Sequence, residues 1–322
     1  MRDLWEAGVV FYKIFTCTTH GVPALLPGPL LAFLTELERF DGLCLVHCED
    51  ESITEENEIR LRASGRVDPA LILEWRTRKA EQVAASTVAL LADLTGPRTI
   101  IAHVSHPRVL DLIARHRAAG ARLWAETCPQ YLYLCEDEVH EHGPFRKFTP
   151  PARSREEADE LWKRVAGGEI THISTDHAPS TRQQKEEGLH NIWDCHFGLP
   201  GAQTTLTMLL EGVHAGRITL ERLVQLTSEE PARLYRLAPQ KGSLLPGADA
   251  DVVLVDLGTQ HVIEDRSMLS RAGWTPYHGR SVHGRPVMTL VRGRVVARDG
   301  AVVARPGTGR LLLGPGARLQ RG

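Results

Sequence analysis

The sequence predicts an α/β protein of the parallel-barrel type, followed by a small β-rich portion. The main observation is a β-branched run, Thr171 to Ser180, that stops abruptly at Asp176. Three earlier runs rich in Val, Ile, Leu or Phe carry a polar residue at or near their ends: VVFYKIF carries Lys13, CLVHCED carries His47 and TIIAHVSHP carries His103. The strands of an α/β barrel present functional side chains from their C-terminal ends. We therefore expect these four ends to converge on one mouth.

Helix-like segments separate these runs. Residues 30–40, LLAFLTELERF, follow a Pro/Gly-rich loop, and residues 107–120, PRVLDLIARHRAAG, end at a glycine that suits a helix C-terminus. The segment 55–94 is charged and then Ala-rich, and we expect it to form a packed helix with one solvated face. Another helix is predicted after Ser154, because Glu157 three residues later completes the pattern of a capping box. Strands that alternate with helices predict a parallel sheet.

The number of predicted strands falls short of a closed barrel. Strand ends are expected near Lys13, His47, His103, Cys128 and Asp176, which gives five strands where a TIM-type barrel has eight. We therefore expect residues 1–240 to form an N-terminally truncated (β/α) barrel. From residue 241 onward, period-2 runs such as DADVVLVDL and RPVMTLVRGRVVARDG are bounded by Gly and Pro turns. Residues 241–322 are accordingly expected to form a small β-sandwich portion.

Composition and charge exclude several classes of partner. The formal net charge of −2 and the lack of a basic stripe with interleaved aromatic residues argue against nucleic-acid binding. No apolar run approaches the roughly 18–20 residues that cross a bilayer, and the N-terminal MRDLWEAG lacks the basic start and apolar core of a signal peptide. The six dispersed cysteines suit reduced thiols. We expect a cytoplasmic protein with no membrane partner, which leaves small polar or anionic ligands as candidates.

The polar strand ends are informative because they occur together. A lone histidine is usually a hydrogen-bonded structural residue, and a lone lysine usually reaches solvent along its aliphatic stem. Lys13, His47, His103 and Asp176 occur at spacings that suit strands four, five, six and eight of a barrel.

With these residues in place, the sequence resembles the amidohydrolase superfamily, and within it the cyclic-amide branch of allantoinases, dihydroorotases and hydantoinases (dihydropyrimidinases). The resemblance covers essentially the whole chain. It is carried by FYKIF, LVHCED, IAHVSH, ETCPQYL, KFTPPAR, GEITHISTDHAPS, GLPGAQ, KGSLLPGADADVVLVD and GWTPYHGR. It implies a homo-oligomeric, metal-dependent hydrolase that opens a cyclic amide, imide or ureide ring by a metal-activated hydroxide.

The resemblance also implies the role of each site residue. Lys13 would be a carboxylated lysine that bridges two zinc ions or other divalent metals. His47 and His103 would bind one metal, and Asp176 would bind the other and shuttle the proton. A lysine ammonium repels a metal, so Lys13 can act as a bridging ligand only as an anionic carbamate. Imidazole and carboxylate ligands complete a site that suits zinc, and two metals together lower the pKa of a bridging water.

One departure from the family pattern bears on activity. Family members carry an H-x-H pair on the first barrel strand, and no such pair precedes Lys13. We therefore expect either a chain that starts inside a longer protein or a non-catalytic relative that acts as a scaffold.

Other departures bear on the substrate. Thr149 stands in the FTPPAR block where a serine often binds the ring, and Gly198 lies at a further ring-contacting position, so both are predicted to bind substrate. Thr18 replaces a hydantoinase tyrosine and Phe197 replaces a hydantoinase asparagine, while the HCED form is closest to allantoinases. The substrate stays open among allantoin, dihydroorotate and hydantoin rings.

Two other sites are less favoured. Cys44, His47 and Cys48 resemble a zinc cluster, but alternation along a strand does not bring all three side chains to one face, and no second pair follows. Cys128 is a candidate nucleophile, but no base can be assigned to it and a packing role is favoured.

Overall fold

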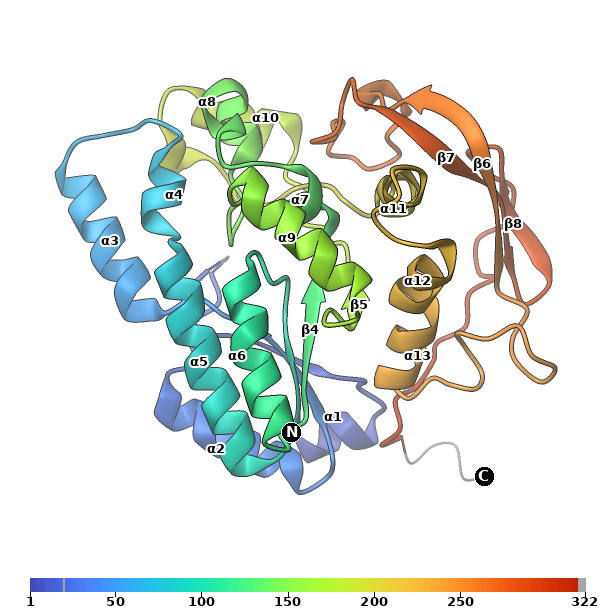
Figure 1. Cartoon of the computed structure of the whole chain (residues 1–322), viewed down its shortest axis with the longest axis horizontal. Helices are drawn as coiled ribbons and strands as arrows, with labels where there is room; N and C mark the ends of the chain where they lie inside the picture. The colour runs from blue at the N-terminus through green and yellow to red at the C-terminus, as the bar shows by residue number, and fades with distance from the viewer. Residues whose placement is uncertain (20, 318–322) are drawn as a thin grey trace. The chain divides into compact units, whose positions relative to one another are not determined.

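The computed structural model describes residues 1–19 and 21–317 (Figure 1). The chain forms two compact units that alternate along the sequence. The parallel-sheet unit comprises Tyr12–Gln203 and Glu264–His278, and the antiparallel-sheet unit comprises Met1–Phe11, Thr204–Ile263 and the residues from Gly279 onward. The sequence predicts a division of the chain into two domains, residues 1–240 and residues 241–322. This division stays a prediction.

The parallel-sheet unit contains five parallel strands in the order β1-β2-β3-β4-β5. They are β1 (Tyr12–Phe15), β2 (Leu43–His47), β3 (Arg98–Ile101), β4 (Leu123–Thr127) and β5 (His172–Ile173). The longer helices are α2 (Pro27–Glu38), α3 (Glu51–Ala63), α5 (Arg78–Thr95), α6 (Pro107–Ala118) and α9 (Arg155–Ala166). Shorter elements are α4 (Leu71–Trp75), α7 (Pro129–Tyr133), α8 (Glu138–His142), α10 (Arg182–Glu186), η1 (Gly143–Arg146), η2 (Glu187–Leu189), η3 (Ile192–Asp194) and η5 (Asp265–Ser267).

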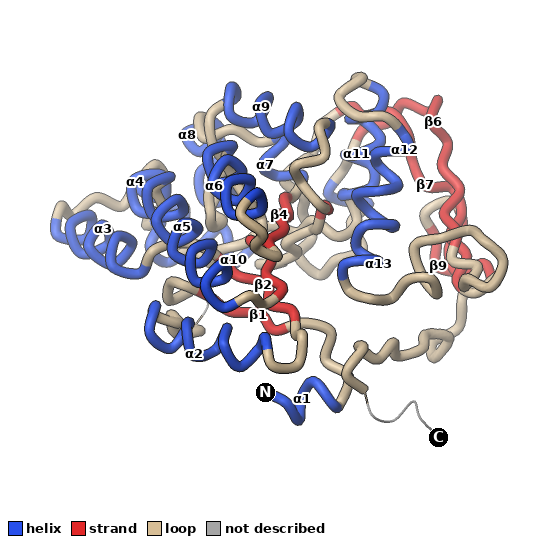
Figure 2. Tube along the Cα trace, turned by 60° about the horizontal axis from the view of Figure 1, so that its bottom comes forward, coloured by secondary structure: helices blue, strands red, loops and turns tan. Residues whose placement is uncertain are grey.

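Helices pack along the strands of this unit. Helix α5 packs against both α2 and α6, and Figure 2 shows these helices beside β1, β2 and β4. Leu30, Leu34 and Leu37 of α2 are fully buried, and burial of one such side chain stabilises a fold by about 1.5–3 kcal/mol. The alternation of strand and helix predicted from the sequence is confirmed.

Local signals in the sequence explain where several helices begin and end. Ser154 accepts a bond from the backbone N–H of Glu157, whose side chain accepts one from the Ser154 N–H, so the predicted capping box of α9 is confirmed. The prediction of one packed helix over 55–94 is wrong, because the segment contains α3, α4 and α5. Gly65 adopts a left-handed φ of +70° after α3, and Thr77 caps the start of α5.

The antiparallel-sheet unit contains four strands in the order β6-β7-β8-β9, and all their pairings are antiparallel. The strands are β6 (Val252–Val262), β7 (Ser281–Val291), β8 (Arg294–Arg298) and β9 (Ala301–Val302). The helices are α1 (Arg2–Glu6), α11 (Thr205–His214), α12 (Leu220–Val224), η4 (Gln225–Glu229) and α13 (Glu230–Leu234). The antiparallel sheet predicted after residue 241 is confirmed, and α11 packs on β7.

Across residues 1–19 and 21–317, no helix is both long and apolar enough to cross a membrane.

Candidate metal centre

Strand register places four ionisable side chains on one face of the parallel sheet. Lys13 and Phe15 pair with Leu45 and His47, so Lys13 and His47 share a face. The same face continues through β3 and β4 to Glu126, which pairs with His172. A period of two along each strand therefore brings Lys13, His47, Glu126 and His172 together on one side of the sheet.

His47 and His103 form a close pair of candidate metal ligands. His47 is the last residue of β2, and His103 follows β3 by two residues. Nδ1 of His47 lies 2.9 Å from Nε2 of His103, and both side chains are buried. Burial, together with the charges of His47 and Lys13, holds the pKa of His103 well below its usual value. His103 therefore stays neutral, which is the form that binds metals.

Lys13 and Asp176 lie within electrostatic reach of this pair. Lys13 keeps solvent contact, yet burial of its ammonium group lowers its pKa against the opposing charges of Glu126 and Asp176. Burial raises the pKa of Asp176, against the opposing charges of Lys13 and His47. The structure thus brings His47 and His103 into contact and places Lys13 and Asp176 within electrostatic reach of them.

Two of these residues have unusual backbone conformations. His103 has a φ of +36° and Asp176 a φ of +43°. Left-handed φ values are uncommon for residues other than glycine, and such strain clusters at functional sites. Both residues lie just beyond their strands, where a left-handed turn redirects the chain.

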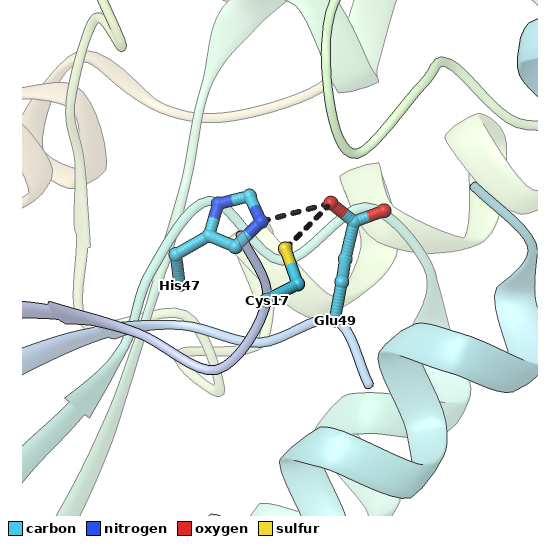
Figure 3. Close-up of side chains that lie close together, drawn as sticks. All are labelled: Cys17, His47 and Glu49. Carbon is cyan, nitrogen blue, oxygen red and sulfur yellow. Dashed lines mark hydrogen bonds and ion pairs between the residues drawn. The ribbon is translucent and has the colours of Figure 1, made fainter. Parts of the chain in front are cut away.

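Glu49 is a site residue that the sequence did not reveal. Its carboxylate is fully buried, and Oε2 lies 2.8 Å from His47 Nε2 (Figure 3). Oε2 also accepts a bond from Thr149 Oγ1 at 2.5 Å and lies 3.5 Å from Arg76 Nη1. Burial opposes ionisation, but Arg76, His47 and Thr149 outweigh it and lower the pKa of Glu49 to about 2.

Cys17, His47 and Glu49 place three potential ligand atoms within 4.8 Å of one another. Arg76 argues against this second grouping as a metal centre, because its Nη1 lies 3.1 Å from Cys17 Sγ and already neutralises Glu49. Burial, together with the Glu49 charge, raises the pKa of Cys17 to about 12, so the thiol keeps its proton at neutral pH. The grouping acts as a supporting hydrogen-bond network.

The two predicted substrate-binding residues lie at the edge of this centre. The Thr149 hydroxyl donates to Glu49 and so belongs to its supporting network. Gly198 packs against Ala178, two residues beyond Asp176, and its N–H donates to the Lys147 carbonyl. Their contact with substrate stays a prediction.

A second buried ion pair lies on the same sheet face. Glu126 Oε2 is 2.9 Å from His172 Nε2, and both side chains are buried. Burial opposes ionisation of Glu126, but His172 and Lys13 lower its pKa. Both residues stand in motifs singled out in the sequence, ETCPQYL and THISTDHAPS. Only the register of β4 and β5 shows that they meet.

The two less favoured sites lack the required geometry. Cys44 pairs in register with Tyr12 and Thr99, so it points to the face opposite His47, and its Sγ contacts Thr99 Oγ1. Cys128 is fully buried, and burial raises the pKa of its thiol well above the usual value. All six cysteines are free, as predicted.

A cavity of about 500 Å³ adjoins the centre. Its lining includes Arg76, which contacts Glu49, and the aromatic side chains of Trp75 and Phe197. Glu51 of α3 lies on another wall and accepts bonds from the backbone and hydroxyl of Thr18.

The residues present fit a divalent metal. Two nitrogen ligands of a tetrahedral zinc ion lie about 3.3 Å apart, given Zn–N distances of about 2.0–2.1 Å. The 2.9 Å between His47 Nδ1 and His103 Nε2 is close to that spacing. Oxygen ligands from Asp176 and from a carboxylated Lys13 would complete a site of mixed nitrogen and oxygen donors.

Comparison with known proteins identifies the family of the chain. The model of the amidohydrolase family matches residues 6–296. The L-hydantoinase of Paenarthrobacter aurescens is 33% identical over 315 residues, which cover 97% of this chain and 69% of that protein. The D-hydantoinase of Ralstonia pickettii is 30% identical over 316 residues, with the same coverage of each chain.

Solved structures show the same likeness. An L-hydantoinase (dihydropyrimidinase) from Arthrobacter aurescens matches with a TM-score of 0.90 at 33% identity, over 97% of this chain and 68% of that one. A D-hydantoinase matches with a TM-score of 0.91 at 30% identity, over the same shares. With a family match over most of its length, and with fold and sequence in agreement, the chain belongs to the amidohydrolase family.

Proposed function

We propose that this chain forms the metal centre of a hydrolase that opens the ring of a cyclic amide or ureide, of the hydantoinase (dihydropyrimidinase) type. The observation that carries the proposal is the 2.9 Å approach of His47 Nδ1 to His103 Nε2, on the sheet face that also carries Lys13. The relatives named L- and D-hydantoinase, 30–33% identical over 97% of this chain, support the choice of ring. We also propose that the five parallel strands belong to a TIM-type barrel and the four antiparallel strands to a β-sandwich.

The proposed metal is zinc. His47 and His103 would hold one ion, Asp176 would hold the other, and Lys13 would bridge them as a carbamate. A bound metal supplies Lewis acidity toward the ring carbonyl and lowers the pKa of water.

Asp176 is the proposed proton carrier. A carboxylate beside the reacting water would accept its proton and return it to the ring nitrogen as the C–N bond breaks, so that this nitrogen becomes the terminal NH2 of the opened ureide. Asp176 follows the end of β5 by three residues and has a left-handed φ. The protein must hold this carboxylate in place, because ring opening needs the proton at both steps.

The cavity beside Arg76 is proposed to receive the ring substituent. Trp75 and Phe197 offer apolar surface, while Thr18 and Glu51 offer polar atoms. The predicted ring contacts of Thr149 and Gly198 belong to this proposal as well.

The test is hydrolysis by the zinc-loaded chain of hydantoin, dihydrouracil, allantoin and dihydroorotate. Because no H-x-H pair precedes Lys13, ring opening of hydantoin or dihydrouracil is expected when the chain is co-expressed with the H-x-H segment of a full-length relative, with loss on chelation and in His47→Asn. The matched control is His116→Asn, because His116 also pairs with a carboxylate, that of Asp93, but lies on α6. Bound zinc without turnover of any ring would favour the alternative, a non-catalytic scaffold relative. Activity that survives both chelation and His47→Asn would refute the proposed centre.

A further inference from the structure

We propose that Glu49 is a positioning residue that fixes the orientation and tautomer of His47, so that His47 Nδ1 presents its lone pair to the metal. This inference rests on the proposed metal centre and adds to it a residue that contacts neither metal nor substrate.

The two nitrogens of the His47 ring have different partners. A neutral imidazole carries one proton, and the hydrogen bond made by one nitrogen decides which nitrogen is left as a ligand. Nε2 of His47 lies 2.8 Å from Glu49 Oε2, and Nδ1 lies 2.9 Å from His103 Nε2. A carboxylate oxygen can only accept, so the proton belongs on Nε2 and the lone pair on Nδ1.

Glu49 is itself held by several hydrogen bonds. Oε2 accepts from the Thr149 hydroxyl at 2.5 Å, and the Arg76 guanidinium, which can only donate, lies 3.5 Å away. The Glu49 backbone N–H donates to Thr16 Oγ1 at 3.1 Å, and the Thr16 hydroxyl donates to the Glu49 carbonyl at 2.8 Å. The carboxylate is therefore fixed from its side chain and from its backbone.

The contact between Glu49 and His47 is buried. Glu49 is 0% exposed, and His47 and Arg76 are almost as deeply buried. Water does not compete for the carboxylate, so its bond to His47 restricts the ring more than the same bond would at the surface. The network thus links the residue that follows β1, the end of β2, the loop that carries Thr149 and the residue that follows α4 to a single ring nitrogen.

Thr149 gains a role from this arrangement. Its hydroxyl is committed to Glu49, and so it supports His47 through one intervening side chain. A metal ligand whose second nitrogen is held in this way binds tighter, and loss of such a partner typically lowers metal affinity about 10- to 100-fold.

The first test measures zinc affinity of the whole chain by competition with a chromophoric chelator. Glu49→Gln keeps the size of the side chain but removes the obligate acceptor, and we expect a loss of about 10- to 100-fold. Glu138→Gln is the matched control, because Glu138 also pairs with an arginine, Arg146, but belongs to α8 and not to the Glu49 network, and it should leave affinity unchanged. His47→Asn removes the ligand itself and gives the zinc affinity expected when His47 no longer binds the metal.

The second test needs no variant of Glu49. In the chain selectively labelled with ¹⁵N-histidine, the His47 signal, assigned by its absence in His47→Asn, should show the proton on Nε2. A proton on Nδ1 overturns the inference even if Glu49→Gln fails to fold.

The outcomes separate the inference from the proposed function. If His47→Asn weakens zinc binding but Glu49→Gln does not, the positioning role is wrong and the metal centre stands. If neither His47→Asn nor His103→Asn affects zinc binding, the metal centre itself is wrong.

Discussion

Nδ1 of His47 and Nε2 of His103 lie 2.9 Å apart, although 56 positions separate the two residues in the sequence. Parallel pairing of β2 with β3 creates this approach, because it brings the C-terminal ends of both strands to the same edge of the sheet. The two rings meet in a T-shaped arrangement with their centroids 4.7 Å apart, and one nitrogen of each faces the other. Folding alone thus assembles half of the proposed metal centre.

The first prediction concerns Lys13. Lys13→Ala should lower zinc affinity by more than the roughly 10- to 100-fold that loss of an outer partner costs, because a ligand itself is removed. Short carboxylic acids should partly restore zinc binding by standing in for the carbamate, whereas Lys13→Arg should not, since a guanidinium cannot form one. Elemental analysis and the competition assay measure both effects. Lys163→Ala, at an exposed lysine of α9, is the control. Normal zinc content in Lys13→Ala would show that Lys13 is not a ligand.

The second prediction concerns Gly198. Its φ is +108°, and an added Cβ would lie 2.5 Å from Ala178 Cβ and closer still to the Ala178 carbonyl oxygen. Gly120 has a φ of +106° but nothing within 4 Å of such an atom. Gly120→Ala should therefore cost only the strain of the left-handed backbone, about 1–2 kcal/mol. Gly198→Ala should cost about 1–3 kcal/mol more, because overpacking adds to that strain.

Urea unfolding of the two glycine variants measures this difference. Since Ala178 lies two residues beyond Asp176, Gly198→Ala should also reduce ring-opening activity more than Gly120→Ala does. Equal losses of stability in the two variants would contradict the close approach of Gly198 to Ala178.

The third prediction concerns pH and Lys185. This lysine is fully buried, and its Nζ donates to the carbonyls of Lys147 and His196. Burial lowers its pKa from 10.5 to about 7. Between these values the unfolded chain holds a proton that the folded chain has released, so the contribution of Lys185 to stability rises with pH from about 7 to about 10.5.

The measurement is the free energy of unfolding of the wild type minus that of Lys185→Met, followed from pH 7 to pH 10. The difference should move in favour of the wild type as pH rises. Lys163→Met serves as the control, because its side chain is exposed, and its difference should stay flat. A difference that stays flat from pH 7 to pH 10 would show that Lys185 stays protonated in the folded chain and would contradict the lowered pKa.

The sequence predicted the strands and their polar ends because these are local patterns. Lys13, His47, His103 and Asp176 each stand at or just beyond a short apolar run, so their convergence followed from the C-terminal edge of a parallel sheet. The bond from His47 to Glu49 could not be predicted, since it depends on the rotamers of both side chains.

The remaining differences come from contacts that are remote in sequence. Glu126 meets His172 only through the register of β4 and β5. The compact units likewise combine distant segments, because Met1–Phe11 joins residues that begin at Thr204. The composition along the chain does not predict which distant segments pack together. The predicted truncated barrel, homo-oligomeric state and cytoplasmic location stay predictions.

The most direct test of the metal centre is anomalous diffraction at the zinc edge from crystals of the chain grown with zinc. We predict a peak within bonding distance of both His47 Nδ1 and His103 Nε2, on the side of the sheet that carries Lys13. A peak only among Cys17, Glu49 and His47 Nε2, or no zinc bound to His47, would contradict it.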